Sequence, residues 1–565
     1  MNKKNLIDET TKQYKTCIKD ILSKTFKDKK IWFSFVSALI LLGVGILANL
    51  LTPFLLKKII ENFSEPNAIP ITLILLSYGL IWTISQGAIH LRGLLTYKIE
   101  QRITYVLGVK VITHLYSLSQ GYFLNQKPGA LTSVIRKAQQ NVPILILGMF
   151  FHVFPTFLEF LFVIILVYSL YPILYSLLIA GVLITFSAHT FFFMQTTSKA
   201  REKANEIDKK VDGAITDWLS NYEAIKIFGQ QDLATHICEG ALKERENAEI
   251  MFMTKFSYVR LGQSLILGIG FASLTYYIGQ GVLNGTLNIG DFVLFNGYVL
   301  QFIIPMSIFG QVIQEMRKAL TDMKGIINLL LTETEVKQSS HPVYLSGSCF
   351  QINFEHVFFK YDERHILNDI SFQIDPGETI LIVGPTGIGK STIAKLLLRL
   401  YDPTKGQIFI NHINIKEIAF QSLYKTIGWV PQETYLLNDS IKNNIQFAQP
   451  NASLNEIERA LDYANLLDFV RSVPQGIDTI VGDRGLKLSG GEKQRLSLAR
   501  LFLKKPQICI FDESTASLDK NTDLLIQENI EKYLPGMTKI IITHRPFTIN
   551  KAHKVINIDG KNVSA

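Results

Sequence analysis

Residues 384–391 read Gly384-Pro385-Thr386-Gly387-Ile388-Gly389-Lys390-Ser391, a complete match to the phosphate-loop pattern G-x-x-x-x-G-K-[ST]. In such a loop, backbone N–H groups surround the phosphates of a nucleoside triphosphate, the lysine reaches the terminal phosphates, and the serine hydroxyl binds Mg²⁺. The apolar run 379–383 precedes the loop, and a helix-patterned run, 391–398, follows it, with Thr392 as a further contact. This order of strand, loop and helix predicts a site for a nucleotide and Mg²⁺.

A second apolar run, 507–511, ends in two adjacent carboxylates, Asp512 and Glu513. A short, continuous apolar run predicts a buried parallel strand, and the phosphates of a nucleotide lie at the carboxyl end of such strands. Asp512 is placed there to hold Mg²⁺ through water, and Glu513 to polarise the attacking water. The alternative is an acidic turn exposed to solvent.

The segment 488–495 reads Leu-Ser-Gly-Gly-Glu-Lys-Gln-Arg. It places Ser489, Gly490 and Gly491 at an expected helix N-terminus, where unpaired N–H groups and the helix dipole favour a γ-phosphate. By itself the segment is also compatible with an ordinary glycine-containing turn.

Long apolar runs indicate a membrane domain in the first part of the chain. Of 565 residues, 48% are hydrophobic, and no charged residue lies between Ile31 and Leu56. As a helix, this run is about 39 Å long, enough to cross a bilayer with some tilt. The other long apolar runs are 69–91, 142–157, 160–193, 261–287 and 292–311. The run 160–193 is too long for one span and is broken by Tyr171-Pro172, so one helix ends and another begins there, giving six spans in total.

The charge distribution and the cysteines indicate how the chain is oriented in the membrane and that its thiols are in a reducing compartment. The net charge is +9, but the basic residues lie beside the spans, so a nucleic-acid partner is not expected. Nine lysines and four acidic residues precede Ile31, which places the N-terminus in the cytoplasm by the positive-inside rule. Six spans return the C-terminal half to the same side. Cys17, Cys238, Cys349 and Cys509 lack metal-ligand spacing, so we expect free thiols.

Four parts follow from the composition along the chain. A basic amphipathic lead-in is expected over 1–30, with a partly disordered tail as the alternative. A transmembrane domain with six helices is expected over 31–331, a polar linker over 332–344, and a nucleotide-binding domain over 345–565. The charged, helix-patterned segments 92–140 and 199–256 predict that the spans continue into the cytoplasm, with turning points at 120–129 and 218–223.

In this order, the motifs resemble those of the ATP-binding cassette exporters, as a half-transporter with its membrane domain first. The resemblance covers nearly all of residues 345–560. It implies the family fold, an α-helical six-span transmembrane domain followed by an α/β phosphate-loop nucleotide-binding domain. It also implies that Tyr361 stacks on adenine and that Gln432, in Val430-Pro431-Gln432, contacts the nucleotide and joins Ser391 and Asp512 in holding Mg²⁺.

The resemblance further implies that two chains act together. In that family, two nucleotide-binding domains face head to tail, so that the signature segment 488–495 of one chain closes over the phosphate loop of the other. A homodimer would then own two competent ATP sites, each with Glu513 and the switch histidine His544, in Thr543-His544-Arg545, as catalytic residues. ATP and Mg²⁺ are the implied cofactors, and the lipid bilayer and a small-molecule substrate the implied partners.

The membrane half is similar to one branch of the family, the mitochondrial-type exporters that handle glutathione-linked thiol compounds and metal conjugates, and their bacterial relatives. The similar segments are 124–131, 220–229, 262–263, 279–282, 289–293 and 320–323, whereas Arg136–Gln140 departs from the branch pattern. This similarity predicts ATP-driven export of a glutathione-related compound across a bacterial inner membrane, with the nucleotide-binding domains in the cytoplasm. An exporter of small peptides or a lipid flippase is the alternative. A non-transport ATPase of the superfamily is disfavoured by the six spans.

Polar side chains inside the predicted spans are candidates for the translocation path, because such groups usually face a cavity or a partner helix. Arg260, Gln263 and Gln301 are the candidate substrate residues, and the first two, one helical turn apart, suit an anionic, amide-rich ligand. Glu159 and Gln311 also lie within or at the ends of spans. For each of these residues, hydrogen bonding between helices is the alternative role.

Overall fold

The structure is a computed structural model and describes residues 16, 18–64, 70–124, 128–385, 387–482, 485–515, 517–543, 552–558 and 563–564. The chain divides into two compact units. The helical unit comprises Met1–Tyr116 and Pro128–Thr332, and the α/β unit comprises Ser117–Lys127 and Glu333–Ala565. The short segment 117–124 therefore packs with the second unit although it lies within the first half of the sequence.

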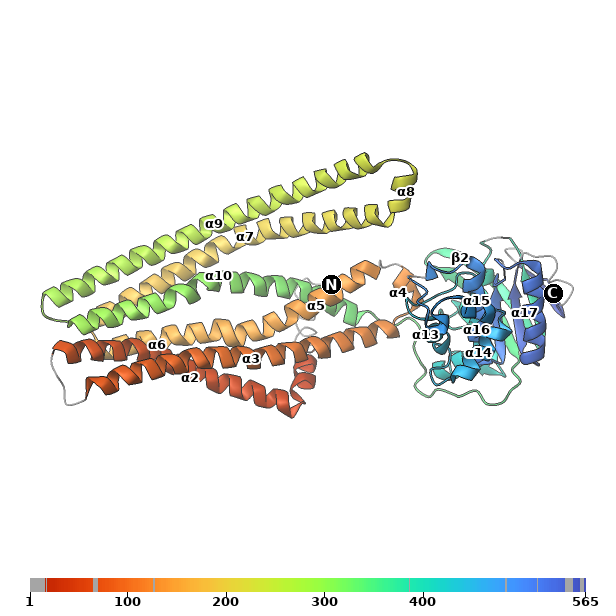
Figure 1. Cartoon of the computed structure of the whole chain (residues 1–565), viewed down its shortest axis with the longest axis horizontal. Coiled ribbons are helices and arrows are strands. Elements are labelled where there is room, and N and C mark those ends of the chain that lie inside the picture. The colour runs from red at the N-terminus through yellow and green to blue at the C-terminus, as the bar shows by residue number, and fades with distance from the viewer. Residues whose placement is uncertain are drawn as a thin grey trace. The chain divides into compact units, whose positions relative to one another are not determined.

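Long helices joined by short turns make up the helical unit (Figure 1). In chain order they are α2 (Lys29–Ser64), α3 (Ile71–Ser117), α5 (Pro128–Gly148), η1 (Met149–Val153), α6 (Phe154–Leu170), α7 (Ile173–Ser220), α8 (Tyr222–Ile227), α9 (Gln231–Leu283) and α10 (Ile289–Leu331). Helices α7 and α9 run side by side, and the short helix α8 joins them at one end.

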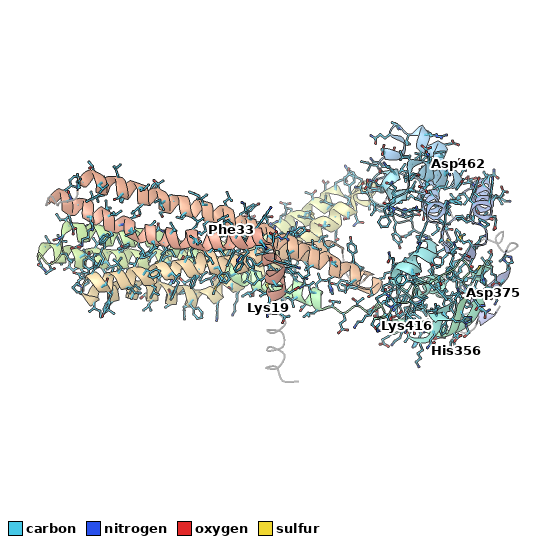
Figure 2. The ribbon with its side chains drawn as sticks, turned by 90° about the horizontal axis from the view of Figure 1, so that it is seen from below. Lys19, Phe33, His356, Asp375, Lys416 and Asp462 are labelled. Carbon is cyan, nitrogen blue, oxygen red and sulfur yellow. The ribbon has the colours of Figure 1, made fainter. Side chains whose placement is uncertain are left out.

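Five stretches of the described helices are long and apolar enough to cross a membrane: Lys29–Phe63, Ile71–Ser117, Val134–Leu170, Ile173–Ser220 and Gln231–Leu283. The sixth span expected from the sequence lies in α10, which carries no charge between Asp291 and Glu315. Apolar side chains such as that of Phe33, labelled in Figure 2, are exposed on this unit. Such a surface suits contact with lipid tails.

The helix break expected at Tyr171-Pro172 is present. Helix α6 ends at Leu170, Tyr171 is extended with φ −135° and ψ 163°, and α7 begins at Ile173. A residue that precedes proline avoids the helical conformation because its backbone clashes with the proline ring. The local sequence therefore separates two helices that the apolar pattern alone would merge.

A π-helical turn, η1, precedes α6. Pro155 has no N–H to donate to the carbonyl four residues before it, that of Phe151. The N–H of Phe154 bonds the carbonyl of Met149, five residues back. Proline thus explains why the span Val134–Leu170 continues through a widened turn.

A half-buried polar cluster ties three parts of the helical unit together. Asp291 Oδ1, in the first turn of α10, accepts hydrogen bonds from Lys57 Nζ of α2 (2.5 Å) and from the hydroxyl of Tyr171 (2.5 Å). Lys57 Nζ also donates to the Tyr171 hydroxyl (3.0 Å). The other oxygen of Asp291 accepts from the N–H of Asn288, the N-cap of α10. One carboxylate therefore caps a helix and neutralises a lysine.

Two sheets form the framework of the α/β unit. The antiparallel sheet has the order β2-β1-β4-β5, built from β1 (Ile352–Tyr361), β2 (Arg364–Ile374), β4 (Lys405–Ile410) and β5 (Ile413–Asn414). The second sheet has the order β10-β9-β3-β8-β7-β6, built from β3 (Thr379–Val383), β6 (Ile427–Val430), β7 (Ile508–Asp512), β8 (Thr538–Ile542), β9 (Lys554–Ile558) and β10 (Val563–Ser564). Only the β9–β10 pair of this second sheet is antiparallel among the described strands.

Helices complete the α/β unit. They are α4 (Gln120–Leu124), α11 (Lys390–Leu397), α12 (Phe420–Thr426), α13 (Ile441–Gln446), α14 (Leu454–Tyr463), α15 (Leu467–Ser472), the 3₁₀ turn η2 (Gly476–Asp478), α16 (Gly490–Lys504) and α17 (Lys520–Tyr533). One buried apolar cluster joins the antiparallel sheet, β3 and α11, and a second joins α14, α16, α17 and β7. The continuous burial of β3 and β7 accounts for their unbroken apolar sequences.

Replacing Asp291 by Asn should destabilise the helical unit by about 2 kcal/mol, because it leaves the half-buried Lys57 ammonium with only the more distant Glu61 carboxylate, 3.5 Å away, as its counter-charge. We expect the midpoint of thermal unfolding in detergent to fall by several degrees. Glu246→Gln is the matched control, since Glu246 pairs with Lys243 on the exposed surface of the same unit. Equal shifts for the two variants would show that the cluster adds no stability.

Candidate functional site

Four parallel strands deliver the sequence-predicted residues to one edge of the sheet. Strands β3, β8, β7 and β6 are adjacent in that order and run in the same direction. The phosphate loop follows β3, Asp512 ends β7, and Gln432 follows β6. Because the carboxyl ends of parallel strands meet at one edge, this arrangement is suited to binding phosphate groups there.

The phosphate loop ends at the N-terminus of α11. Gly389 caps this helix with φ +115°, and a Cβ there would lie 2.8 Å from the side chains of Ile366 and Leu367, so only glycine fits. Lys390 Nζ donates hydrogen bonds to the carbonyl oxygens of Gly384 (2.8 Å) and Pro385 (3.0 Å). The loop therefore holds its lysine beside the first turn of α11, where unpaired N–H groups favour anions.

The carboxylates and their neighbours form a compact polar group. Asp512 is buried and accepts a hydrogen bond from the Ser391 hydroxyl. Gln432 Nε2 donates to Glu513 Oε2 (2.7 Å), which leaves the Gln432 amide oxygen to face a cation. Glu513 has φ +48°, a left-handed conformation that is costly for a residue with a side chain and typical of functional positions.

The charges of this group are adjusted by burial. Burial raises the pKa of the Asp512 carboxyl, and the charge of Glu513 adds to this effect, while Ser391, Lys395 and Lys390 lower it. Burial also lowers the pKa of the Lys390 ammonium, opposed by the carboxylates of Glu513 and Asp512. A divalent cation beside Asp512 would stabilise its charged form. The carboxylate, hydroxyl and amide oxygens of Asp512, Ser391 and Gln432 are the ligand types that Mg²⁺ prefers, so these residues fit that ion.

The signature segment forms a helix N-terminus, as the sequence predicts. Helix α16 begins at Gly490, and Ser489 caps it, exchanging hydrogen bonds with Glu492. A Cβ on Gly491 would lie 3.3 Å from the backbone carbonyl oxygen of Ser517, which leaves little room for a side chain. The exposed glycines thus leave the first N–H groups of α16 accessible to a phosphate.

Gln494 is a residue of this region that sequence reasoning did not single out. It is buried on α16, and its Oε1 accepts the N–H of Ser517 (2.9 Å). Ser517 opens the segment 517–519 that follows the carboxylate pair. Gln494 therefore links the signature helix to the segment after Glu513. Its position within the motif 488–495 is the sequence signal that could have identified it.

Some predicted residues lie outside the described part of the chain or in other surroundings. His544 and Thr386 are outside the described residues. Tyr361 ends β1, and its ring packs edge-on against Tyr401, with 5.2 Å between centroids. Ile388 lies in the phosphate loop, and Thr392 lies in the first turn of α11, where it is buried.

The candidate translocation residues have different surroundings. Gln263 is buried on α9, and its Nε2 donates to the Thr190 hydroxyl of α7 (2.8 Å). Arg260, one turn earlier, is exposed, with its guanidinium 5.8 Å from the centre of the Phe256 ring. Gln301 Oε1 is buried and has no hydrogen-bond partner among the described residues. Gln263 is therefore buried between two helices, whereas Arg260 is exposed.

Glu159 is engaged between helices. Its Oε1 accepts a hydrogen bond from Asn49 Nδ2 (3.4 Å), and Asn49 Oδ1 accepts from the Ser85 hydroxyl (2.5 Å). These residues belong to α6, α2 and α3. Glu159 therefore takes part in hydrogen bonds between helices, the role that is the alternative to substrate contact.

An α/β unit with this phosphate site, on the same chain as membrane-crossing helices, defines an ATP-driven membrane transport protein. Comparison with known families agrees: the ABC transporter transmembrane region matches residues 35–306, and the ABC transporter domain matches residues 367–516. The chain belongs to the ATP-binding cassette (ABC) transporter family. It is a multi-pass membrane half-transporter whose α/β unit binds ATP with Mg²⁺ and couples ATP hydrolysis to export.

Full-length relatives refine this placement. The mitochondrial iron–sulfur clusters transporter atm1 of Aspergillus fumigatus is 32% identical over 99% of this chain and 80% of the relative. The mitochondrial iron–sulfur clusters transporter ABCB7 of Danio rerio is 31% identical over 94% and 73%. A solved structure of a bacterial Atm1-family ABC exporter with ATP bound is 30% identical, with a TM-score of 0.86 over 95% of both chains. The exporter resemblance and its mitochondrial-type branch are confirmed.

Lys390→Ala should weaken ATP binding roughly ten- to a hundredfold, because it removes the positive charge beside the phosphate loop. Equilibrium binding of a fluorescent ATP analogue measures this change. Lys416→Ala is the control, since Lys416 is exposed on the same unit (Figure 2). An unchanged affinity in Lys390→Ala would show that the ammonium does not contact the phosphates.

Proposed function

We propose that this half-transporter works as a homodimer that exports a glutathione-related thiol compound or metal conjugate across a bacterial inner membrane, with the α/β units in the cytoplasm. The observation that carries the substrate class is similarity over nearly the whole chain to an iron–sulfur clusters transporter and, at 32% identity over 93% of the chain, to the heavy metal tolerance factor 1 of Caenorhabditis elegans. The bacterial exporter of similar length supports the location.

The proposed hydrolytic step uses the residues at the sheet edge. Lys390 and the N–H groups of α11 hold the phosphates, and Asp512, Ser391 and Gln432 hold Mg²⁺. When bound, Mg²⁺ supplies charge neutralisation at the transferred phosphoryl group. Glu513 orients and polarises the attacking water, and its bond to Gln432 fixes the carboxylate for that task. We assign the switch role to His544, by the family resemblance.

Exposed apolar side chains on α8 and its neighbours support a second chain as partner. Tyr222 is 58% exposed, Ile227 79% and Phe228 74%, so three large apolar or aromatic side chains close in sequence are all exposed. Such an apolar patch on a charged helical hairpin is a typical interaction surface. In the homodimer, α8 would dock on a nucleotide-binding domain, and the signature helix α16 of one chain would complete the ATP site of the other.

Arg260 is the strongest candidate for contact with cargo among the predicted substrate residues. Its guanidinium is exposed and matches carboxylates, of which glutathione compounds carry several. Gln263 donates one amide hydrogen bond to Thr190, and its amide oxygen would accept a hydrogen bond from the cargo. Gln301 has a buried amide oxygen with no partner among the described residues, and a donor on the cargo would satisfy it.

Glu513→Gln should retain ATP binding and lose hydrolysis by at least about a hundredfold, because the amide cannot take the proton of the attacking water. ATPase rate and ATP affinity of the purified dimer measure the two effects separately. Glu528→Gln, an exposed change on α17, is the matched control. If the Glu513 variant turned over ATP at a rate near that of the wild type, the base would be another residue.

Oxidised glutathione should raise the ATPase rate of the membrane-embedded protein, because a ligand that favours the arrangement preceding closure shifts the population toward closure. Arg260→Ala should reduce this stimulation several-fold and leave the basal rate unchanged. Lys255→Ala, another exposed cation on α9, should leave both unchanged. Stimulation by a small peptide or a lipid, with no response to glutathione compounds, would favour the alternative cargo.

A further inference from the structure

A short helix, residues 18–26, precedes α2, and we call it the lead-in helix. It turns away from the direction of α2 (Figure 1). Asp20 of this helix accepts a hydrogen bond from Lys110 Nζ of α3 (2.6 Å). Asp28, just after the helix, lies 4.0 Å from the guanidinium of Arg102, also on α3. Two charge pairs to α3 therefore hold the lead-in helix beside the point where the first span begins.

One face of the lead-in helix is packed, and another is hollow. Ile21 and Thr25 are buried. Ile18, Leu22 and Phe26 line a cavity of about 520 Å³ whose walls are almost entirely apolar. Residues four apart lie on the same face of a helix. The lead-in helix thus has, beside its buried face, an apolar face that the described residues leave partly uncovered.

Aromatic rings join this cavity to the first span. The Phe26 ring packs edge-on against the rings of Trp32 and Phe35 of α2, with the centroids 5.9 and 5.0 Å apart. Trp32 is 53% exposed, and the adjacent Phe33 is 71% exposed (Figure 2). The apolar surface of the cavity therefore continues into the surface of α2 that suits contact with lipid tails.

Unpaired lysines accompany this apolar surface. Four exposed lysines lie on the lead-in helix or just after it: Lys19, which also lines the cavity, Lys27, Lys29 and Lys30. None of the four forms an ion pair among the described residues, whereas Lys24 pairs with Asp20 (3.5 Å). Asp20 and Asp28 are the acidic residues of this segment, and both are already engaged with α3. The segment therefore presents four positive charges that no carboxylate of its own neutralises.

A ligand of this surface must match both the charge and the cavity. Lysines are favoured on the cytoplasmic side of any membrane span, which accounts for the charge but not for the cavity. A soluble anion would bind the lysines and leave the apolar walls exposed to water. A phospholipid with an anionic headgroup satisfies both features, because its phosphate accepts hydrogen bonds from ammonium groups and its acyl chain fills an apolar cavity beside a span.

We propose that the lead-in helix and the start of α2 form a binding site for a phospholipid whose headgroup carries a net negative charge. Lys19 donates to the phosphate at the rim of the cavity, and the neighbouring lysines attract the same headgroup. One acyl chain packs on Leu22 and Phe26. The site is separate from the ATP site and from the candidate translocation residues, and it does not depend on the identity of the cargo.

Titration of the full-length dimer in detergent tests the site, with phosphatidylglycerol and zwitterionic phosphatidylcholine of the same chain length as probes. Phosphatidylglycerol should raise the midpoint of thermal unfolding by several degrees, because it binds the folded protein. Phosphatidylcholine should bind at least about tenfold more weakly. Phosphatidylglycerol with brominated chains should quench the fluorescence of Trp32, and Trp32→Phe should remove that component of the quenching.

Variants of the lysines test the headgroup contact. The triple variant Lys19→Gln, Lys27→Gln, Lys30→Gln should bind phosphatidylglycerol at least about tenfold more weakly and bind phosphatidylcholine as the parent does. Its unfolding midpoint without lipid should equal that of the parent, since the three side chains are exposed. The matched control removes the same charge from exposed lysines of α7, as Lys203→Gln, Lys209→Gln, Lys210→Gln, and should leave both affinities unchanged.

Leu22→Ser tests the chain contact, and it should weaken the binding of both lipids several-fold. Equal affinities of the parent for the two lipids would overturn the proposal, as would a triple variant that binds phosphatidylglycerol like the parent. If soluble glycerol phosphate protected the protein as well as the lipid does, the surface would be an anion site and not a lipid site. Quenching that persists unchanged in Trp32→Phe would place the bound lipid elsewhere.

Discussion

The parallel alignment of β3, β8, β7 and β6 is the constraint on which the ATP site depends. Each strand is only four or five residues long, and each ends at the same edge of the sheet. Reversal of β7 alone would carry Asp512 to the opposite edge, about 15 Å away at the usual rise of a strand. The buried aliphatic side chains of these strands therefore contribute to catalysis by fixing where the polar residues emerge.

Local sequence explains the features that could be predicted. The phosphate loop, the strand before Asp512, the capped start of α16 and the break at Tyr171-Pro172 each depend on residues within a few positions of one another. Gly389 and Pro172 act through backbone conformations that other residues adopt poorly. The long spans follow from the requirement that a helix in lipid be apolar over about 20 residues.

Contacts between distant segments could not be predicted in this way. Gln263 meets Thr190 only because α7 and α9 pack in a particular register, and Ser119 meets Glu335 across more than 200 positions of sequence. The cluster of Lys57, Tyr171 and Asp291 likewise joins three segments whose charges or hydroxyls look unrelated in the sequence. Helix rotation and register set such pairs, and a single sequence with no partner information does not reveal either.

The assignment of segment 117–124 to the α/β unit means that the two units interlock along the chain. A fragment that begins at Glu333 would keep both sheets but lose α4, the helix that covers Tyr401 and Glu335. Its phosphate loop would be intact, while an aromatic and acidic surface normally covered would meet water. The unit that hydrolyses ATP is therefore not separable by a single cut, and a unit moved into a related transporter keeps the native cover of Tyr401 and Glu335 only if α4 moves with it.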